Sequence, residues 1–451
     1  MTSFNKAASR PYRVLLATFV SWKLFLLALS LGAYLAGDAY DTSAALAVQP
    51  HDDVIDHGSN SGPQHPGLAY HVVGLITRLA SWDAIYFTSI ARRGYRIEQE
   101  WAFGAGLPGV VRGLLGALEY VGILSKLDPS SHGALRETLA ALFVTNTSHI
   151  FSVFFFYHLT ITLWPNRPFF ALTSSVLHIF SPAGLFLSAP YAESCFAALA
   201  FAGWLLLARS CRSEDNALLR DTYIVLAGVV FGLATVFRSN GVLNGIPFAW
   251  EMVRLLPRLG HRPVDTMRRL LALGVGGVCV ALGSVVPQAV AWMRFCSDGV
   301  GDVRPWCKAY LPSIYAFVQK YYWGVGFLQY WRLPNLPLFL LAAPMITIML
   351  RSATNYLTQP QTFVSSKPAE SARLLRLIQS TAAAQAMLAV LAVTNYHVQI
   401  ITRISSGYPL WYWWVAEQLS NKKSLGHVII VFMIMYASIQ GVLFASFLPP
   451  A

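Results

Sequence analysis

Long apolar segments recur along almost the whole chain. A helix that crosses a bilayer needs about 20 mainly apolar residues. Eleven segments approach that description: 14–36, 138–163, 169–188, 192–209, 222–238, 240–256, 269–293, 336–351, 376–397, 405–418 and 428–447. Only 12% of the 451 residues are charged, against about a quarter in soluble domains. The sequence therefore predicts an all-α polytopic membrane protein with about eleven transmembrane helices.

One further apolar stretch, 103–123, differs from the other eleven. It carries Arg112, Glu119 and several glycines. Charged side chains are costly in the middle of a bilayer. We therefore interpret this stretch as a re-entrant or interfacial helix and not as a span.

The basic residues before the first span predict how the chain is threaded. Lys6, Arg10 and Arg13 precede the span, and such residues favour the cytoplasmic side. Alternating spans then leave two large lumenal segments, 37–137 and 294–335. A cleaved signal peptide is the alternative, but the apolar stretch is longer than the usual signal core of about 7–15 residues. We favour an uncleaved anchor.

The same threading accounts for the net charge. A formal charge of +12 ordinarily raises nucleic acid as a partner. Here the basic residues gather in segments such as 251–269 and 351–376, which the threading places in the cytoplasm, as is typical of membrane proteins. We therefore expect no nucleic-acid partner, and a single transmembrane domain covering 1–451.

The cysteines permit a disulfide and do not suggest a metal site. Cys296 and Cys307 lie in the second large lumenal segment, a compartment in which disulfides persist. Their pairing and two free thiols remain alternatives at this stage. Nowhere does the spacing of Cys and His suggest zinc.

The first lumenal segment contains the most informative residues. In Ser81-Trp82-Asp83-Ala84-Ile85-Tyr86-Phe87, an acid lies among apolar and aromatic residues beside the membrane, and Glu100 and Trp101 follow in the same segment. A carboxylate such as Asp83 can accept a proton from a hydroxyl group. The alternative is an interfacial aromatic belt whose acid caps the next helix.

Several further polar residues lie at the predicted lumenal ends of spans. Ionisable groups at membrane depth are expensive and by default functional, although a single one is more often a snorkelling group. Arginine also binds phosphate oxygens with its planar fork. The residues are Glu193, Arg238, Asn240, His397, Gln399 and Arg403.

These residues would suit a sugar donor carried on a polyprenyl phosphate. The tail of such a donor lies in lipid, its phosphate at the membrane surface and its sugar on the lumenal side. Transfer needs a base for the acceptor hydroxyl and positive charge beside the departing phosphate. Asp83 and the arginines are candidates for these two roles.

The motifs in this chain resemble those of a known family, the PIG-V type of GPI mannosyltransferase II within the GT-C class of glycosyltransferases. They occur in one order along nearly the whole length. They are SWDAIYF (81–87), ARRGYRIEQEWAF (91–103), SPAGLFLSAPYAES (181–194), FRSNG (237–241), RPWCKAYLPSIYAFVQKYYWGVGFLQYW (304–331), LAAP (341–344), HVQIITR (397–403) and FLPPA (447–451). Family members usually continue after WAF with Phe-Pro-x-x-Pro, whereas this chain has FGAGLP (103–108).

The resemblance implies an enzyme of the endoplasmic reticulum membrane with a lumenal active site. It would transfer the second mannose, in an α1,6 linkage, from dolichyl-phosphate-mannose to the Man-GlcN-phosphatidylinositol precursor of GPI anchors. The class inverts the anomeric carbon, uses a single carboxylate in the first lumenal loop and needs no metal in most members. Asp83 is the matching residue. Fungal members work with a small accessory membrane protein.

Secondary roles follow for the other residues. We expect His397 and Arg403 to contact the donor phosphate, with Arg238 and Gln399 beside them. Acceptor binding or support of Asp83 falls to Trp82, Glu100, Trp101, Glu193 and Asn240. The rival functions are another dolichyl-phosphate-mannose-dependent mannosyltransferase, and a lipid transporter or scramblase without enzymatic activity.

Overall fold

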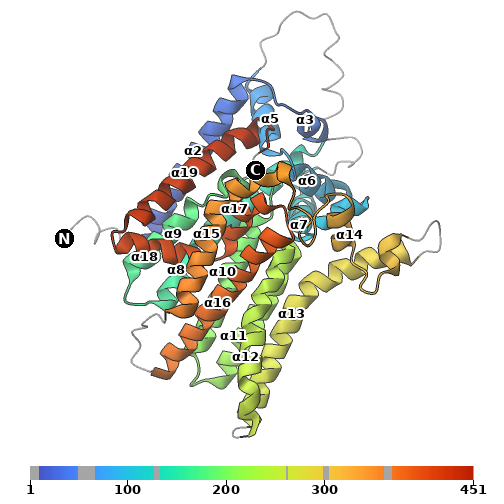
Figure 1. Ribbon diagram of the computed structural model, residues 1–451. Coiled ribbons are helices and arrows are strands. Elements are labelled where there is room, and N and C mark those ends of the chain that lie inside the picture. The colour runs from blue at the N-terminus through green and yellow to red at the C-terminus, as the bar shows by residue number, and fades with distance from the viewer. Residues whose placement is uncertain are drawn as a thin grey trace, which may run out of the picture.

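A computed structural model describes residues 10–48, 67–125, 133–260, 263–297, 304–359 and 368–449. Within these ranges the chain forms helices and no strands (Figure 1). Lys6, one of the residues used to orient the first span, lies outside the described part. The all-α class predicted from the sequence is confirmed.

Eight helices in the described part are long and apolar enough to cross a membrane. Each coincides with one of the predicted spans. They are α2 (Pro11–Ala36), α8 (Leu135–Leu163), α10 (Glu193–Arg212), α11 (Ala217–Phe237), α13 (Pro263–Cys296), α15 (Leu336–Thr358), α16 (Pro368–Thr394) and α19 (Ser424–Ala445).

The other three predicted spans are short helices, each joined to a 3-10 turn. They are α9 (Pro168–Ile179) before η3 (Gly184–Leu187), α12 (Ile246–Leu255) after η4 (Ser239–Gly245), and α18 (Leu410–Ser420) after η9 (Ser405–Gly407). Proline and glycine near the junctions account for the breaks, because both interrupt helices. Broken helices at membrane depth are tolerated where they are buried in protein or line a cavity. The breaks therefore indicate where a cavity lies.

Glycines allow α11 and α13 to pack very closely. A Cβ atom at Gly228 would collide with the backbone of Gly276, and one at Gly232 with the carbonyl of Cys279. A Cβ at Gly283 would collide in turn with the carbonyl of Gly232. Small residues at helix contacts are typical of membrane proteins. This contact fixes the end of α11, from which η4 continues.

The first large loop forms short helices at one end of the bundle (Figure 1). Its helix α7 is only 15 residues long and packs against α6 and α8. One face buries Leu107 and Val111, while Tyr120 is exposed. This agrees with the amphipathic helix predicted for 103–123. The elements are α3 (Ser43–Val48), α5 (Leu68–Leu79), α6 (Ala84–Arg93), η2 (Glu98–Ala102) and α7 (Gly106–Tyr120).

The second large loop docks onto the first. Glu98 of η2 is buried and accepts hydrogen bonds from the Trp306 indole at 3.0 Å and the Tyr322 hydroxyl at 3.3 Å. Cys296 and Cys307 are joined by a disulfide with Cα atoms 5.7 Å apart. The loop carries η6 (Pro305–Lys308), α14 (Ile314–Tyr321) and η7 (Leu333–Asn335).

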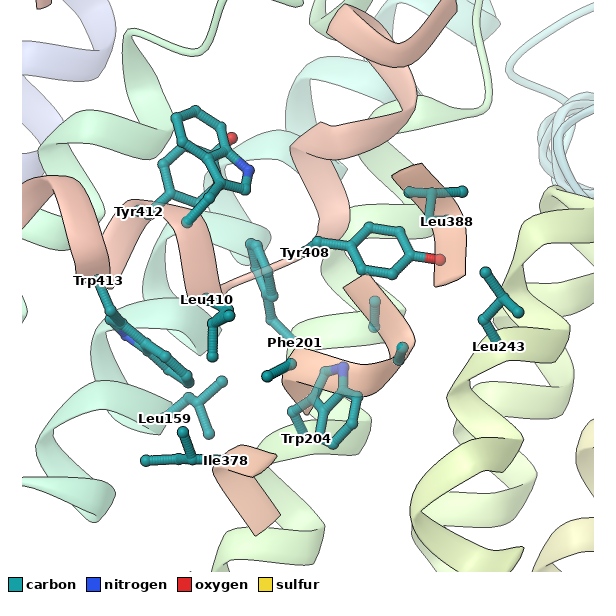
Figure 2. Close-up of a cluster of buried hydrophobic side chains, with 14 of the residues drawn as sticks. Leu159, Phe201, Trp204, Leu243, Ile378, Leu388, Tyr408, Leu410, Tyr412 and Trp413 are labelled. Carbon is teal, nitrogen blue, oxygen red and sulfur yellow. The ribbon is translucent and has the colours of Figure 1, made fainter. Parts of the chain in front are cut away.

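Large aromatic side chains fill the centre of the bundle (Figure 2). Trp204 of α10 and Trp413 of α18 are both buried, and the Trp413 indole donates to Thr160 Oγ1 at 2.9 Å. Tyr408 continues this core toward the functional end, because its hydroxyl donates to the carbonyl of Asn240 at 3.2 Å. The aromatic core and the predicted site are therefore one packed unit.

We expect Gly232→Val to separate α11 from α13, because its new side chain would meet the backbone of Cys279. The measurable result is a lower yield of detergent-extracted, monodisperse protein. Gly274→Val on α13 is the matched control, because a Cβ there meets nothing within 4 Å. Equal yields for the two variants would contradict the close contact.

Candidate active site

A cavity of about 520 Å³ lies where the two large loops meet the breaks at η3 and η4 and the segment that leads into η9. Phe186 of η3, Ser239 of η4 and Ile400 near α17 (Ile401–Ile404) all contribute to its wall. The cavity also collects most of the residues chosen from the sequence. Those lining it are Trp82, Asp83, Arg238, Asn240, His397, Gln399 and Arg403.

Asp83 stands at the start of α6. Its backbone occupies the N-cap position, but its side chain makes no capping hydrogen bond. One carboxylate oxygen instead accepts from Arg403 Nη2 at 3.0 Å. About a third of the side chain, 34%, remains exposed. The capping alternative considered from the sequence is therefore wrong, and the carboxylate faces the cavity.

Arg403 belongs to a chain of four charges. Its Nε atom lies 3.5 Å from Glu193 Oε1, and Arg238 Nη1 donates to the same oxygen at 2.5 Å. Glu193, the first residue of α10, is completely buried. A buried carboxylate needs such partners, since an unpaired charge in a low-dielectric interior is strongly unfavourable. Glu193 thus fixes both guanidinium groups that line the cavity.

The environment of Arg403 keeps it charged. Burial alone would lower the pKa of Arg403, but the carboxylates of Asp83 and Glu193 raise it overall. The guanidinium also lies over the rings of Phe186 and Tyr191, with distances of 5.0 and 5.6 Å to the ring centroids. Cation–π contacts of this kind stabilise a desolvated cation.

The loop between η3 and α10 is held from two sides. Lys23, inside α2, donates to the carbonyl of Leu187 at 2.9 Å and to Ser188 Oγ at 2.7 Å. On the other side, the Tyr191 hydroxyl donates to the carbonyl of Ser81 at 3.3 Å. The charged residue inside the first span therefore has a structural partner, and the loop connects Glu193 to the segment that carries Asp83.

His397 and Gln399 form the opposite wall. The Tyr330 ring meets the His397 imidazole edge-on at 4.9 Å, and its hydroxyl donates to Gln399 Oε1 at 3.3 Å. Burial, followed by the nearby charge of Arg403, lowers the pKa of His397. This shift favours the neutral imidazole, which has one N–H donor.

Three predicted residues do not line the cavity: Glu193, which pairs with the two arginines of its wall, and Glu100 and Trp101. Glu100 binds Arg93 and accepts hydrogen bonds from the backbone N–H groups of Arg96 and Ile97, which closes the turn before η2. Trp101 stacks on Tyr95 at 4.4 Å. Both residues shape the loop after α6. Their role is therefore indirect: the carbonyl of Glu100 accepts from the N–H of Phe103 at 3.0 Å, and Phe103 lines the cavity.

The cavity wall includes residues that the sequence did not single out. Tyr315, Gln319 and Trp323 line it from α14 and the turn that follows. From the sequence, the aromatic-rich motif 304–331 that contains them allows two interpretations, stacking on a glycan or anchoring at the membrane surface. These residues reach the cavity because their segment docks on η2. Residue spacing does not reveal that tertiary contact.

Two glycines of FGAGLP (103–108), the stretch in which this chain lacks the first proline of the usual family pattern, lie against the end of α11. A Cβ at Gly104 would collide with the carbonyl of Phe237, and one at Gly106 would approach the Phe237 ring to 2.5 Å. The loop after η2 therefore packs directly beside the residue that precedes Arg238. Glycine permits this approach because it has no side chain.

The site offers a carboxylate, two guanidinium groups, an imidazole and three side-chain amides around one cavity. Within the described ranges, no group of three or more His, Cys, Asp or Glu side chains is placed to hold a metal ion. Arg238 Nε and Trp82 Nε1 are buried and lack a hydrogen-bond partner in the described part of the chain. The Asp83 carboxylate is suited to deprotonate a hydroxyl, and the guanidinium groups are suited to neutralise a phosphate.

Comparison with known sequences identifies close relatives of this chain. The pattern of the family "Mannosyltransferase (PIG-V)" matches residues 15–451. A protein of Chaetomium globosum named GPI mannosyltransferase 2 is 53% identical, over 98% of this chain and 97% of its own length. A protein of Gibberella zeae with the same name is 47% identical over 98% of both chains.

Comparison with solved structures gives a more distant similarity. The oligosaccharyltransferase of Archaeoglobus fulgidus aligns over 93% of this chain with 13% identity and a TM-score of 0.39. This chain spans 53% of the length of that protein. The assignment of this chain to a family therefore rests on its sequence relatives and not on this structural similarity.

We expect Glu193→Gln to destabilise the protein strongly. Removing one member of a buried ion pair leaves partner charges uncompensated and typically costs about 3–5 kcal/mol. A lower thermal midpoint in detergent measures the effect. Glu119→Gln is the control, because Glu119 pairs with Arg136 at 3.3 Å in a partly exposed position and such pairs contribute about 0–1 kcal/mol. Equal midpoints for the two variants would contradict the structural role of Glu193.

Proposed function

This chain belongs to the mannosyltransferase (PIG-V) family and is a glycosyltransferase of the membrane, and from that premise we propose its reaction. It transfers the second mannose of a GPI anchor, in an α1,6 linkage, from dolichyl-phosphate-mannose to Man-GlcN-phosphatidylinositol. The observation that carries the proposal is the Asp83 carboxylate in the cavity, 3.0 Å from the partly buried guanidinium of Arg403. The names of the relatives support the GPI pathway.

The proposed location is the endoplasmic reticulum membrane, with the N-terminus in the cytoplasm and the cavity on the lumenal side. Basic residues before the first span favour this orientation. The disulfide between Cys296 and Cys307 lies in a loop at the cavity end, and disulfides persist in oxidising compartments. Both observations support a lumenal cavity.

In the proposed reaction Asp83 is the base. A hydroxyl oxygen of the acceptor attacks the anomeric carbon of the donor mannose and gives its proton to Asp83. The bond from that carbon to the phosphate oxygen breaks, and its electron pair leaves with dolichyl phosphate. A single displacement inverts the anomeric carbon and needs only one carboxylate as base, whereas a retaining double displacement needs a second as nucleophile.

Arg403 and Arg238 are proposed to neutralise the departing phosphate. Both line the cavity, and both are oriented by Glu193. Fixed positive groups at the place where charge develops stabilise the transition state without reorganisation. His397 and Gln399 add neutral hydrogen-bonding groups. We propose that these residues replace a metal ion and that the reaction needs no cofactor.

The acceptor is proposed to bind on the side of α14. Tyr315 and Trp323 present aromatic surface there, and Asn240 and the Trp82 indole contribute polar groups. Aromatic rings combine apolar faces with hydrogen-bonding edges, which suits sugar rings. A glycolipid headgroup between α14 and Asp83 would bring its hydroxyl to the base.

A lipid transporter or scramblase shares the spans and the intramembrane charges. It would not need a partly exposed carboxylate paired with an arginine in the wall of a cavity. Mixing purified protein with donor and acceptor separates the two classes, because only a transferase releases polyprenyl phosphate. The other alternative is a different dolichyl-phosphate-mannose-dependent step. Identifying the acceptor that receives the mannose tests it.

We expect Asp83→Asn to abolish mannose transfer, because an amide cannot accept the hydroxyl proton, while the protein still accumulates in membranes. Transfer of labelled mannose to glycolipid in isolated membranes measures the effect. Asp41→Asn is the control: Asp41 lies in the same loop, accepts a hydrogen bond from the N–H of Ser43 at 2.7 Å and does not line the cavity. Near-normal transfer by Asp83→Asn would exclude Asp83 as the base.

The step in the pathway has its own prediction. Cells that lack this chain should accumulate the GPI precursor bearing one mannose, because the second cannot be added. Mass spectrometry of extracted glycolipids identifies the intermediate. Accumulation of a precursor without mannose, or with two, would assign the protein to another step.

A further inference from the structure

Two bulky aromatic residues at the cavity have unusual backbone conformations. Among the described non-glycine residues, those with positive φ are Trp82 at 59°, Phe447 at 58°, Leu328 and Lys422. Left-handed conformations are costly for bulky residues and persist only where the surrounding structure enforces them. Trp82 and Phe447 stack on each other, with ring centroids 5.0 Å apart and planes 29° apart.

Phe447 occupies a position that usually holds glycine. The N–H of Leu448 donates to the carbonyl of Leu443 at 2.9 Å, and the N–H of Phe447 to that of Phe444 at 3.1 Å. This is the Schellman pattern that ends a helix, and its left-handed residue is normally Gly. Glycine would therefore suit the backbone conformation at position 447 better than phenylalanine. What phenylalanine adds is a ring, which is only 7% exposed.

The same framework holds both partners of the stack. Arg78, three residues before Ser81, donates to the carbonyl of Ala445 at 3.4 Å and to that of Gly37 at 2.8 Å. The N–H of Tyr40 donates to the carbonyl of Ser446 at 3.0 Å. The end of α19 is thereby fixed to the segment that leads into Asp83.

Trp82 makes the turn that presents Asp83. The N–H of Ala84 donates to the carbonyl of Ser81, and that of Ile85 to the carbonyl of Trp82 at 3.1 Å. A change of the left-handed φ at Trp82 would rotate the next residue and displace its carboxylate from the cavity. The Phe447 ring opposes such a change by covering the indole, and Pro449 from the same segment reaches the cavity wall.

We propose that Phe447 is a positioning residue for the reaction. Its ring stacks on Trp82, holds the left-handed turn and so keeps the Asp83 carboxylate in its reactive position. The proposal rests on the proposed role of Asp83 as base. A displacement of about 1 Å at a reacting group can cost on the order of a hundredfold in rate.

Three variants of Phe447 test the proposal in membranes that contain the full chain. Phe447→Gly suits the backbone and removes the ring, Phe447→Leu keeps apolar volume without a ring, and Phe447→Tyr keeps the ring. We expect kcat for mannose transfer to fall about tenfold or more in the first two and to stay within about twofold in the third. Apparent KM for donor and acceptor should stay within about twofold throughout, because neither substrate contact is removed.

Lys422→Gly is the matched control, because Lys422 has φ of 53° in the turn between α18 and α19 and is absent from the cavity wall. Its kcat should be unchanged. If Phe447→Gly fails to accumulate in membranes, the kcat of Phe447→Leu tests the proposal in its place. Retention of kcat by Phe447→Leu, or by Phe447→Gly where it accumulates, would overturn the proposal.

A double-mutant cycle separates positioning from general packing. If Phe447 acts through Trp82, Phe447→Leu should lower kcat by less than about twofold in a Trp82→Ala background, since coupled residues are not additive. Full additivity would overturn the proposal. Asp83→Asn is assayed alongside: normal transfer by that variant defeats the proposed base, whereas an inactive Asp83→Asn with an active Phe447→Leu defeats only the role of Phe447.

Discussion

A single buried carboxylate organises the functional end of this protein. Glu193 starts α10 with no exposed surface and meets Arg238, which follows α11, and Arg403 of α17. Three chain segments far apart in sequence therefore converge on one acid. The energetic demand of pairing a buried charge is strong, so the positions of both guanidinium groups follow from it. Asp83 joins this arrangement through Arg403.

The bundle provides the low-dielectric setting in which these pairs act. The glycine contact between α11 and α13 brings η4 and Arg238 into place, and the aromatic core extends to Asn240 through Tyr408. Helices that break at the cavity release backbone and side-chain groups toward it, which a membrane protein tolerates only at a protein-lined space. The breaks at η3 and η4, together with the segment before η9, are thus part of the site.

Much of this arrangement was accessible from the sequence. The length of the apolar segments predicted the helices. The energetic cost of ionisable groups at membrane depth indicated that Glu193, Arg238 and Arg403 are functional. Residue spacing could not predict which residues form ion pairs. Asp83 and Arg403 are 320 residues apart, and their contact depends on tertiary packing. The cavity-facing side of α14 escaped prediction for the same reason. Phe447 escaped because its backbone conformation leaves no compositional signal.

Charge balance explains why one guanidinium can serve both the base and the phosphate. Before the proposed reaction, Arg403 faces the anionic carboxylate of Asp83 at 3.0 Å. As the hydroxyl proton moves to Asp83, that carboxylate loses its charge while the departing phosphate gains one. Attraction to Arg403 therefore shifts from the carboxylate to the phosphate in the same step, and the guanidinium remains paired throughout. In a buried site this continuity matters, because an unpaired charge there is costly at every stage.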